Sequence, residues 1–430
     1  MSNSLRVLLG LLVVSLFALV VTGNALYSQL VYLLVFLVAG SWVWSRLALR
    51  GVQVHRMTRL QRAQAGQILG ERFVIRNNSR IPILWLEVED HSDLPDSRGS
   101  RVFTRIAGRQ SQFYLSRTRL LNRGSFTLGP TKVLAGDVFG FFQVSSTFVA
   151  EKSLLVYPYM VDLHTLPNPA GFLIGGEALR RKTHQITPNA AGVREYVSGD
   201  SMSRIHWKST ARRNHLMVKE FELDPKAEVW LFLDMYEHAQ AVLPTADRFS
   251  ADMFWIDSEK TVLSPSTDEY AISITASIAR YYLIRARAVG LVSSALDAEV
   301  LTPDRGSHQL EKILEFLALV KAKGEIPFHT LLAREAQQIP RGSTVVLVTP
   351  SVDPQIAISL DQMMSLGLHP VVILLDAESF GGLPGTMQVM DTVKSMHIPV
   401  CRIENAADLA KSLNQWGNAT SVSQISRIGL

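Results

Sequence analysis

The sequence predicts a two-helix transmembrane hairpin, an all-β sandwich and a doubly wound α/β domain, in that order. Three patterns predict them. Two long apolar runs come first, short alternating runs bounded by turn residues follow, and apolar strands then alternate with amphipathic helices. We place the boundaries at residues 1–45 for the hairpin, 46–165 for the sandwich, 166–225 for a linker, 226–418 for the α/β domain and 419–430 for a tail.

Composition describes the class of protein but not its chemistry. The chain has 430 residues, which at roughly 150 residues per domain predicts two or three domains. With 47% hydrophobic and 19% charged residues it does not resemble a disordered chain, and a net charge of +5 is too small to indicate a nucleic-acid-binding protein. A single cysteine, Cys401, excludes a disulfide framework and a thiolate zinc cluster.

The first 45 residues contain two apolar runs, at 5–21 and 26–44, and Arg6 is the only charged residue in them. Each run is about long enough to cross the hydrocarbon core of a bilayer. The connection between them is short, so the two helices must run antiparallel. A cleaved signal peptide with Arg6 in its n-region is the alternative, and the immediate second apolar run disfavours it.

Positive charges predict the orientation of this hairpin. The turn between the runs has none, whereas Arg46, Arg50, Arg56, Arg59 and Arg62 follow the second run. The positive-inside rule then places both ends of the hairpin, and everything after residue 45, in the cytoplasm. We therefore expect a multi-pass protein of the cytoplasmic membrane, in which these arginines could also contact anionic lipid headgroups.

The region up to residue 159 is predicted to be rich in short strands, with examples at 73–76, 84–89, 126–128 and 154–157. Strands at this spacing without a helical period indicate an antiparallel sandwich. Residues 46–132 contain 16 Lys and Arg against 6 Asp and Glu. A basic surface beside an anionic leaflet explains this excess. Binding of nucleic acid is the alternative, although no aromatic-interleaved motif accompanies the charge.

Three stretches of the sequence carry a family resemblance. Residues 123–130 read RGSFTLGP, residues 137–142 read DVFGFF, and residues 194–212 read REYVSGDSMSRIHWKSTAR. They resemble the signature of the domain-of-unknown-function 58 family, and the resemblance extends over nearly the whole chain. The residues that match the longest motif are Arg194, Tyr196, Gly199, Asp200, Arg204, Ile205, His206, Trp207, Lys208, Ala211 and Arg212.

The resemblance implies where the protein lies and which proteins it works with, but it implies no reaction. Members are membrane-anchored, have a C-terminal von Willebrand factor A-like domain, and are encoded beside MoxR-type AAA+ ATPases and transglutaminase-like membrane proteins. The family has no established enzymatic activity and no cofactor. The resemblance therefore implies a membrane-tethered scaffold or adaptor that works with a MoxR-type ATPase in the assembly or maturation of a protein complex.

The longest motif is predicted to form a short helix. Asp200 is a suitable N-cap, Arg204 can pair with it four residues later, and Trp207 and Ala211 repeat at the spacing of a packing face. Such a helix would either lock the sandwich to the following domain or form a partner-binding epitope. A hydrolase in which Asp200 orients His206 and Ser209 is the nucleophile is a further alternative, but no nucleophile elbow accompanies these residues.

From residue 228 on, strands are predicted at 229–233, 290–292, 344–348, 371–375 and 398–401, and helices at 269–288, 310–320, 356–366 and 406–416. This alternation predicts a mainly parallel, doubly wound sheet. The pattern is similar to the von Willebrand factor A fold, in which a D-x-S-x-S loop supplies hard oxygen ligands to a divalent ion.

The matching loop in this chain is degenerate. Asp234 is kept, but Tyr236 and His238 replace both serines, and Thr349-Pro350-Ser351 stands where an acidic residue is expected. We therefore expect no metal ion and no catalytic site here, with Asp234 capping a backbone turn instead. An enzyme using Asp234 remains the alternative. The long insert at 237–267 contains Phe249, Met253, Phe254 and Trp255, which would either cover the domain's own core or contact a partner.

Overall fold

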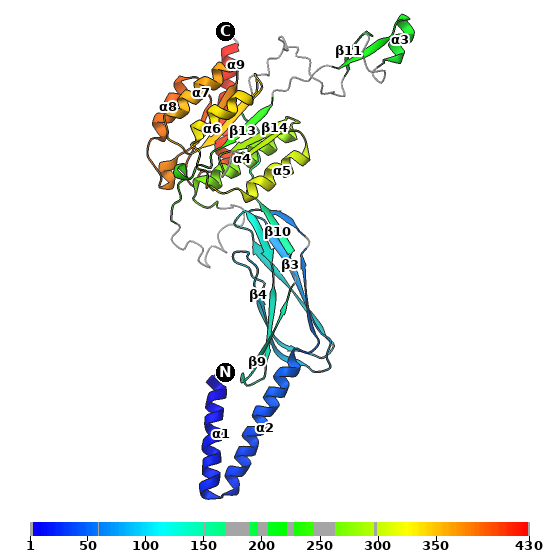
Figure 1. Ribbon diagram of the computed structural model, residues 1–430, viewed down its shortest axis with the longest axis vertical. Coiled ribbons are helices and arrows are strands. Elements are labelled where there is room, and N and C mark those ends of the chain that lie inside the picture. Colours follow the sequence, from blue (N-terminus) through cyan, green and yellow to red (C-terminus); the bar gives the residue numbers. More distant parts are fainter. Residues whose placement is uncertain are drawn as a thin grey trace. The chain divides into compact units, whose positions relative to one another are not determined.

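The computed structural model describes residues 3–58, 60–149, 152–167, 190–196, 205–221, 228–244, 263–295 and 299–428. The chain divides into two compact units. One contains the N-terminal helices and the β-rich region, and the other contains the sheet of the C-terminal domain (Figure 1).

Two apolar helices open the chain, as the sequence predicts. Helix α1 (Asn3–Thr22) and helix α2 (Ala25–Ala48) are both long and apolar enough to cross a membrane. Gly23 adopts a positive φ of 64° between them, and the Asn24 side chain accepts a hydrogen bond from the Leu26 amide at 3.0 Å. These two residues end one helix and cap the next, which allows the tight reversal.

The β-rich region contains ten strands, and its predicted all-β character is confirmed. The strands are β1 (Val52–Thr58), β2 (Arg62–Gln64), β3 (Ile68–Asn77), β4 (Ile83–Asp90), β5 (Arg101–Ile106), β6 (Ser111–Arg119), β7 (Gly124–Leu128), β8 (Thr131–Gly136), β9 (Gln143–Phe148) and β10 (Lys152–Tyr157). They form the sheets β1-β3-β6, β5-β4-β8-β9 and β2-β10-β7. All pairs are antiparallel except β2 with β10.

The first two sheets share one apolar core. Phe73 and Ile75 from β3 pack in the same cluster as Leu86 from β4 and Val133 from β8. Alternation along β3, in which every second residue is buried, places these side chains on the inner face. Ala48, the last residue of α2, joins this cluster, so α2 is packed directly onto the β-rich region.

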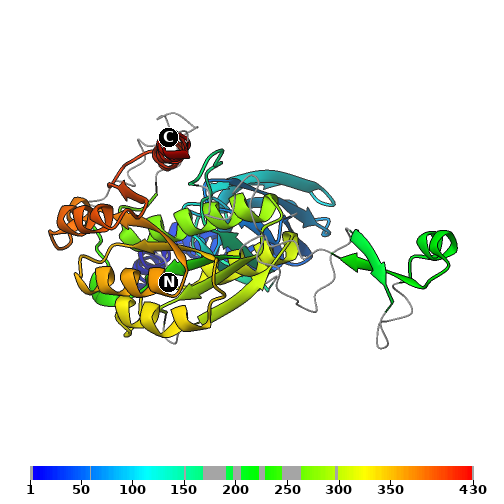
Figure 2. The same ribbon diagram turned by 90° about the horizontal axis from the view of Figure 1, so that it is seen from above.

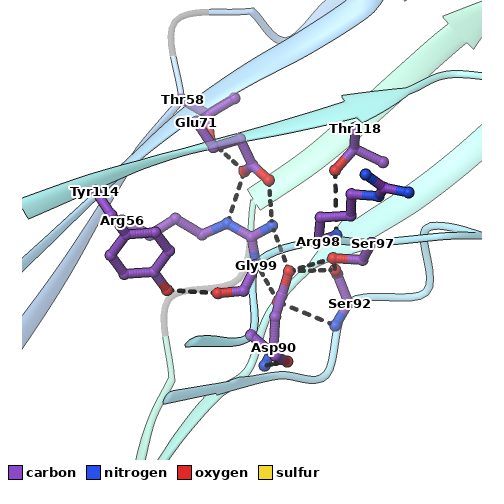
Figure 3. Close-up of polar contacts among 11 residues, drawn as sticks. Arg56, Thr58, Glu71, Asp90, Ser92, Ser97, Arg98, Gly99, Tyr114 and Thr118 are labelled. Carbon is purple, nitrogen blue, oxygen red and sulfur yellow. Dashed lines mark hydrogen bonds and ion pairs between the residues drawn. The ribbon is translucent and has the colours of Figure 1, made fainter. Parts of the chain in front are cut away.

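A buried ion network lies within this region (Figure 3). The guanidinium of Arg56 donates to both Glu71 carboxylate oxygens at 2.7 Å and to Asp90 at 2.8 and 3.2 Å. The side chain of Arg56 is 2% exposed and those of Glu71 and Asp90 are fully buried. Asp90 also accepts hydrogen bonds from the hydroxyls of Ser92 and Ser97. One arginine of the basic excess is thus structural and does not contribute to the basic surface.

The C-terminal domain is built on a six-stranded sheet with the order β15-β14-β13-β16-β17-β18. Its strands are β13 (Val229–Leu233), β14 (Val289–Ser293), β15 (Glu299–Asp304), β16 (Thr344–Thr349), β17 (His369–Leu375) and β18 (Val400–Ile403). All neighbours are parallel except β14 and β15. The predicted mainly parallel α/β sheet is therefore confirmed.

Both faces of this sheet are covered. Phe232 and Leu347 pack in one cluster with residues of α6 (Phe328–Glu335), α7 (Gln355–Ser365) and α8 (Thr386–Ser395). Intervening strand residues such as Leu231 and Ile373 are equally buried on the other face. Figure 2 shows helices on both sides of the sheet. Further described helices are α4 (Thr267–Ile284), α5 (Ser307–Leu319) and α9 (Leu409–Ile428).

The predicted strands and helices of this domain are all found, with ends shifted by at most four residues except in the last helix. Helix α9 is predicted to end at residue 416 but continues to Ile428. Helices α6 and α8 and the antiparallel strand β15 are additional. The two helices are only 8 and 10 residues long, so each offers little periodicity. Strand β15 contains Pro303, which lowers strand propensity but is accommodated at the edge of the sheet.

Candidate ligand-binding cavity at the carboxyl edge of the sheet

The strand order of the C-terminal sheet reverses between β13 and β16. Strand β13 is followed along the chain by β14 on one side, whereas β16 is followed by β17 on the other. The segments that leave the carboxyl ends of two such strands diverge, and in open α/β sheets this is where ligands bind. The segments here begin at Asp234 and at Pro350.

A cavity of about 500 Å³ lies at this point. Its walls come from the segment after β13, the start of α6, the segment after β16, and the turn that follows the short 3-10 helix η5 (Ala377–Phe380). The lining residues are Tyr236, His238, Ala239, Gln240, Pro327, Phe328, Pro350, Ser351, Val352, Asp353, Ala377, Gly381, Gly382 and Leu383. Its volume lies in the range of ligand-binding sites.

The walls combine apolar surface with a few polar groups. The rings of Tyr236 and His238 lie edge to face, with centroids 5.3 Å apart. Leu383 is 64% exposed, although it belongs to the lining. The carboxylate of Asp353 lies 2.9 Å from Nδ1 of His329, so it is held in place. Such a surface suits an apolar or aromatic side chain flanked by polar groups.

Asp234, the residue kept from the degenerate metal loop, lies beneath the cavity and is fully buried. One carboxylate oxygen accepts a hydrogen bond from the Tyr236 amide at 3.0 Å, and the other accepts one from the Thr349 hydroxyl at 2.6 Å. The Thr349 hydroxyl in turn accepts from the Ser351 amide at 2.9 Å. Asp234 therefore caps the turn after β13, as the sequence predicts, and ties it to the turn after β16.

Gly324 fixes the turn that follows Asp234. Its amide donates to the Met235 carbonyl and its carbonyl accepts from the Glu237 amide, both at 2.9 Å. A Cβ atom on Gly324 would lie 1.6 Å from the carbonyl oxygen of Ser294. Only glycine lets the backbone come so close, and this contact holds the turn in place.

The residues at this loop do not fit the divalent ion that a von Willebrand factor A fold implies. Asp234 uses its oxygens in hydrogen bonds within the protein and has no exposed surface. Tyr236 and His238 replace the hydroxyl ligands and line the cavity instead. A magnesium ion needs several small oxygen donors that reach one point, and the loop 234–238 contains no serine hydroxyl to supply them.

Burial makes Asp234 sensitive to pH. Desolvation raises its pKa from 3.8 to about 6, and the hydrogen bonds from Thr349, Tyr236 and Ser294 oppose this rise. Because the folded-state pKa lies above the unfolded value, the stability linked to this group is complete below about pH 4 and is lost as the pH rises through about 6. In Asp234→Asn no charge is buried. Its unfolding free energy relative to the parent should therefore rise by up to about 3 kcal/mol between about pH 4 and pH 8.

Denaturant titrations of the purified parent and of the Asp234→Asn variant at both pH values would measure this. A difference between the two proteins that stays constant with pH would contradict the buried, protonated carboxyl group.

The longest family motif lies on a separate set of elements. Strands β11 (Ala190–Glu195) and β12 (Met217–Phe221) pair antiparallel, with Arg194 opposite Val218, and helix α3 (Trp207–Arg213) lies between them in sequence. The amide of Tyr196 donates to the Leu216 carbonyl at 2.8 Å. Ile205 is 4% exposed and bridges to Val218, so its predicted place in a core is confirmed.

The helix of this motif begins later than predicted. Its N-cap is His206, whose Nδ1 accepts from the Ser209 amide at 3.2 Å and lies 2.7 Å from the Ser209 hydroxyl. His206 thus satisfies a free amide of the first helical turn. The predicted packing face is wrong, because Trp207 is 68% exposed and Ala211 is also exposed. A helix of seven residues contacts β12 only through its first turn, so Lys208 and Arg212 are exposed as well.

Several predicted residues lie outside the described part of the chain. They are Gly199, Asp200 and Arg204 of the family motif, and Phe249, Met253, Phe254 and Trp255 of the insert. In contrast, sequence reasoning missed Gly324 and Ser294, which close and brace the turn at Asp234. An isolated glycine after a predicted helix was the only signal for Gly324, and it does not show which backbone approaches it.

Comparison with known proteins shows two sequence similarities. Residues 192–364 match the family described as "Protein of unknown function DUF58". A protein of Bacillus subtilis (strain 168), described as "Uncharacterized protein YeaD", is 26% identical over 352 residues, which are 80% of each chain.

The solved structures that are similar to parts of the chain are distant. The CARDB domain of the PF1109 protein from Pyrococcus furiosus has 7% identity and a TM-score of 0.19, with 24% of this chain and 86% of that chain covered. The cupredoxin domain of amoB from Nitrosocaldus yellowstonii has 10% identity and a TM-score of 0.20, with 33% and 97% covered. By sequence, residues 192–364 are thus similar to the family described as "Protein of unknown function DUF58", which agrees with the resemblance of the motif at residues 194–212.

Proposed function

We propose that the protein is a membrane-tethered scaffold or adaptor whose C-terminal domain holds a segment of a partner protein in the cavity between Tyr236 and Leu383. The observation that carries this proposal is the position of the cavity at the reversal of the strand order, with apolar walls and fixed polar groups. A bound side chain would pack on these walls and hydrogen-bond to the polar groups, without help from a metal ion or cofactor.

A von Willebrand factor A-like fold for the C-terminal domain is part of this proposal. Numbered along the chain, its six strands have the order 3-2-1-4-5-6, and the third strand is the antiparallel one at the edge. This arrangement supports the similarity read from the strand and helix pattern. The proposed binding mode differs from a metal-dependent one, because Asp234 is sealed and Tyr236 contributes a ring to the cavity wall.

A non-catalytic role is also proposed. His206 and Asp234, the residues of the hydrolase alternative, both act as backbone caps. The exposed Trp207, with exposed Lys208 and Arg212 beside it, supports a second contact with a partner. Tryptophan and arginine are enriched among residues that dominate protein interfaces.

The partner proposed from the family resemblance is a MoxR-type AAA+ ATPase, with a transglutaminase-like membrane protein as a further candidate. The test is capture from detergent-solubilised membranes by the full chain, with and without EDTA. We expect an ATPase of this class to be retained in EDTA and to be lost with Leu383→Asp, which places a charge in the cavity. Met387→Asp is the matched control, because Met387 is 48% exposed and is not part of the lining.

Two results would contradict this function. Loss of the captured ATPase in EDTA would indicate that binding of the partner depends on a metal ion. Equal capture by Leu383→Asp and Met387→Asp would show that the cavity is not part of the contact. Capture of other proteins but of no AAA+ ATPase would contradict the proposed identity of the partner.

We propose that the domains after residue 45 face the cytoplasm. The support is the cluster of arginines after the second apolar helix and the absence of charge in the turn before it. A reporter enzyme or fluorescent protein fused after Leu430 should therefore give the cytoplasmic readout in intact cells. An extracytoplasmic readout would show that the domains after residue 45 lie on the other side of the membrane.

A further inference from the structure

The turn between β8 and β9 is rigid and exposes apolar side chains. It spans residues 137–142, which is the second family motif. The Asp137 carboxylate accepts hydrogen bonds from the Phe139 amide at 3.0 Å and the Phe142 amide at 2.7 Å. Gly140, at a φ of 70°, allows the chain to turn back. Asp137 is 6% exposed, so it holds the loop from inside.

The tip of this loop points away from the β-rich core. Val138 is 67% and Phe139 is 57% exposed. The rings of Phe139 and Phe141 stack with centroids 5.5 Å apart, which adds to the apolar surface of the tip. The internal carboxylate already fixes this loop. Burial of its two large apolar residues against another surface would therefore cost little conformational entropy.

The loop lies beside the end of helix α2. Helix α2 contacts both β8 and β9, and Ala48 packs in one cluster with Ala135. Ser41 and Ser45 of α2 are 5% and 1% exposed, whereas Phe36, further into the apolar run, is 75% exposed. Figure 1 shows the β9 end of the turn beside the upper part of α2.

The depth of the tip follows from these contacts. Phe139 is four residues beyond Ala135, which is at most about 13 Å along an extended chain and less because the chain turns after Gly136. A helix of about 13 Å corresponds to about nine residues. Counted back from Ala48, this places the tip no deeper than Ala39 and in the range of Trp42 of α2, whose ring is 50% exposed and lies 5.6 Å from the Arg46 guanidinium. Tryptophan at the end of an apolar helix typically lies at the membrane–water interface.

Exposed arginines surround the tip at this end of the β-rich region. Arg50 follows α2, and Arg80 and Arg109 lie in neighbouring turns that are joined by a hydrogen bond from the Arg109 amide to the Ser79 carbonyl. Strand β4 pairs with β8 so that Leu86 faces Ala135, which brings its start to the level of the loop. The turns at 78–82, 107–110 and 137–142 contain one acidic residue, the buried Asp137.

We propose that the loop at residues 137–142 is a second membrane contact, in which Val138 and Phe139 insert into the interface of an anionic bilayer and Arg80 and Arg109 bind lipid headgroups. This inference rests on the proposed membrane tether, since α2 sets the depth of the loop. Its function would be to hold the β-rich region on the membrane at a second point beside α2.

The test uses the full chain in which Cys401 is replaced by alanine and single cysteines carry a polarity-sensitive fluorophore. The protein is reconstituted in vesicles of phosphatidylcholine and phosphatidylglycerol whose acyl chains are brominated near the headgroup. The test position is Val138→Cys. The matched control is Val149→Cys, which is 75% exposed and follows the opposite end of the same β8–β9 pair. Phe36→Cys reports the tether.

We expect quenching by the brominated lipid at positions 138 and 36, and none at position 149. Quenching at 36 without quenching at 138 would overturn the loop contact and leave the tether intact. No quenching at 36 would overturn the tether, and the loop contact with it. In vesicles without phosphatidylglycerol, or after Arg80→Gln with Arg109→Gln, quenching should fall at 138 and stay unchanged at 36. Unchanged quenching at 138 would overturn the role of the arginines.

Discussion

Replacing Arg56 by methionine should lower the free energy of unfolding of the β-rich region by about 3–5 kcal/mol. Arg56 is the single cation between the buried carboxylates of Glu71 and Asp90, to which it donates at 2.7 to 3.2 Å. Without it, both carboxylates must stay charged in an apolar core or take up protons, and each course costs free energy. Denaturant unfolding of the purified chain would measure the loss.

The matched control for this variant is Arg72→Met. Arg72 is on the outer face of β3 directly after Glu71, is exposed, and lies over the Phe113 ring at 4.3 Å. Removing it should cost less than about 1 kcal/mol. In a double variant with Glu71→Gln, the loss caused by Arg56→Met should be smaller, because one buried charge is gone. Equal losses for Arg56→Met and Arg72→Met would show that the network is not a source of stability.

Substitution of Gly324 by alanine should destabilise the C-terminal domain by about 3 kcal/mol or more, at the upper end of the costs of overpacking. The new Cβ would meet the Ser294 carbonyl oxygen and lie 2.9 Å from the Met235 carbonyl oxygen, which are both backbone atoms. No side-chain rotation relieves such a contact. The segment must move away, which breaks its hydrogen bonds to Met235 and Glu237 and disturbs the turn that follows Asp234.

Thermal unfolding of Gly324→Ala beside Lys323→Ala would test this. Lys323 is the exposed preceding residue in the same segment, so its replacement removes a side chain without a backbone clash. A melting temperature for Gly324→Ala equal to that of Lys323→Ala would contradict the close backbone contact. Where Gly324→Ala does unfold earlier, the exposed Asp234 should also regain an ordinary pKa, and the pH dependence assigned to it should disappear.

The predictable elements of the fold are those with a strong local signal. Long apolar runs predict α1 and α2, and the four apolar strands β13, β14, β16 and β17 are buried on both faces, so they can be read without their partners. Helices α6 and α8 are short, and their apolar residues only become one face through packing on Phe232 and Leu347. The spacing of Trp207 and Ala211 also predicts a packing face, but local spacing does not show whether another element lies there. No described element covers Trp207.

The candidate site also combines features that the local sequence predicts with features that only tertiary contacts create. The sequence alone determined that Asp234 caps a turn, because the cap depends on residue types within a few positions. The tertiary structure decided that Thr349 reaches Asp234, that Gly324 packs on the backbone of Met235, and that Tyr236 and Leu383 line one cavity. These contacts join residues more than 80 positions apart in sequence, and their distances follow from strand order, which local propensity does not encode.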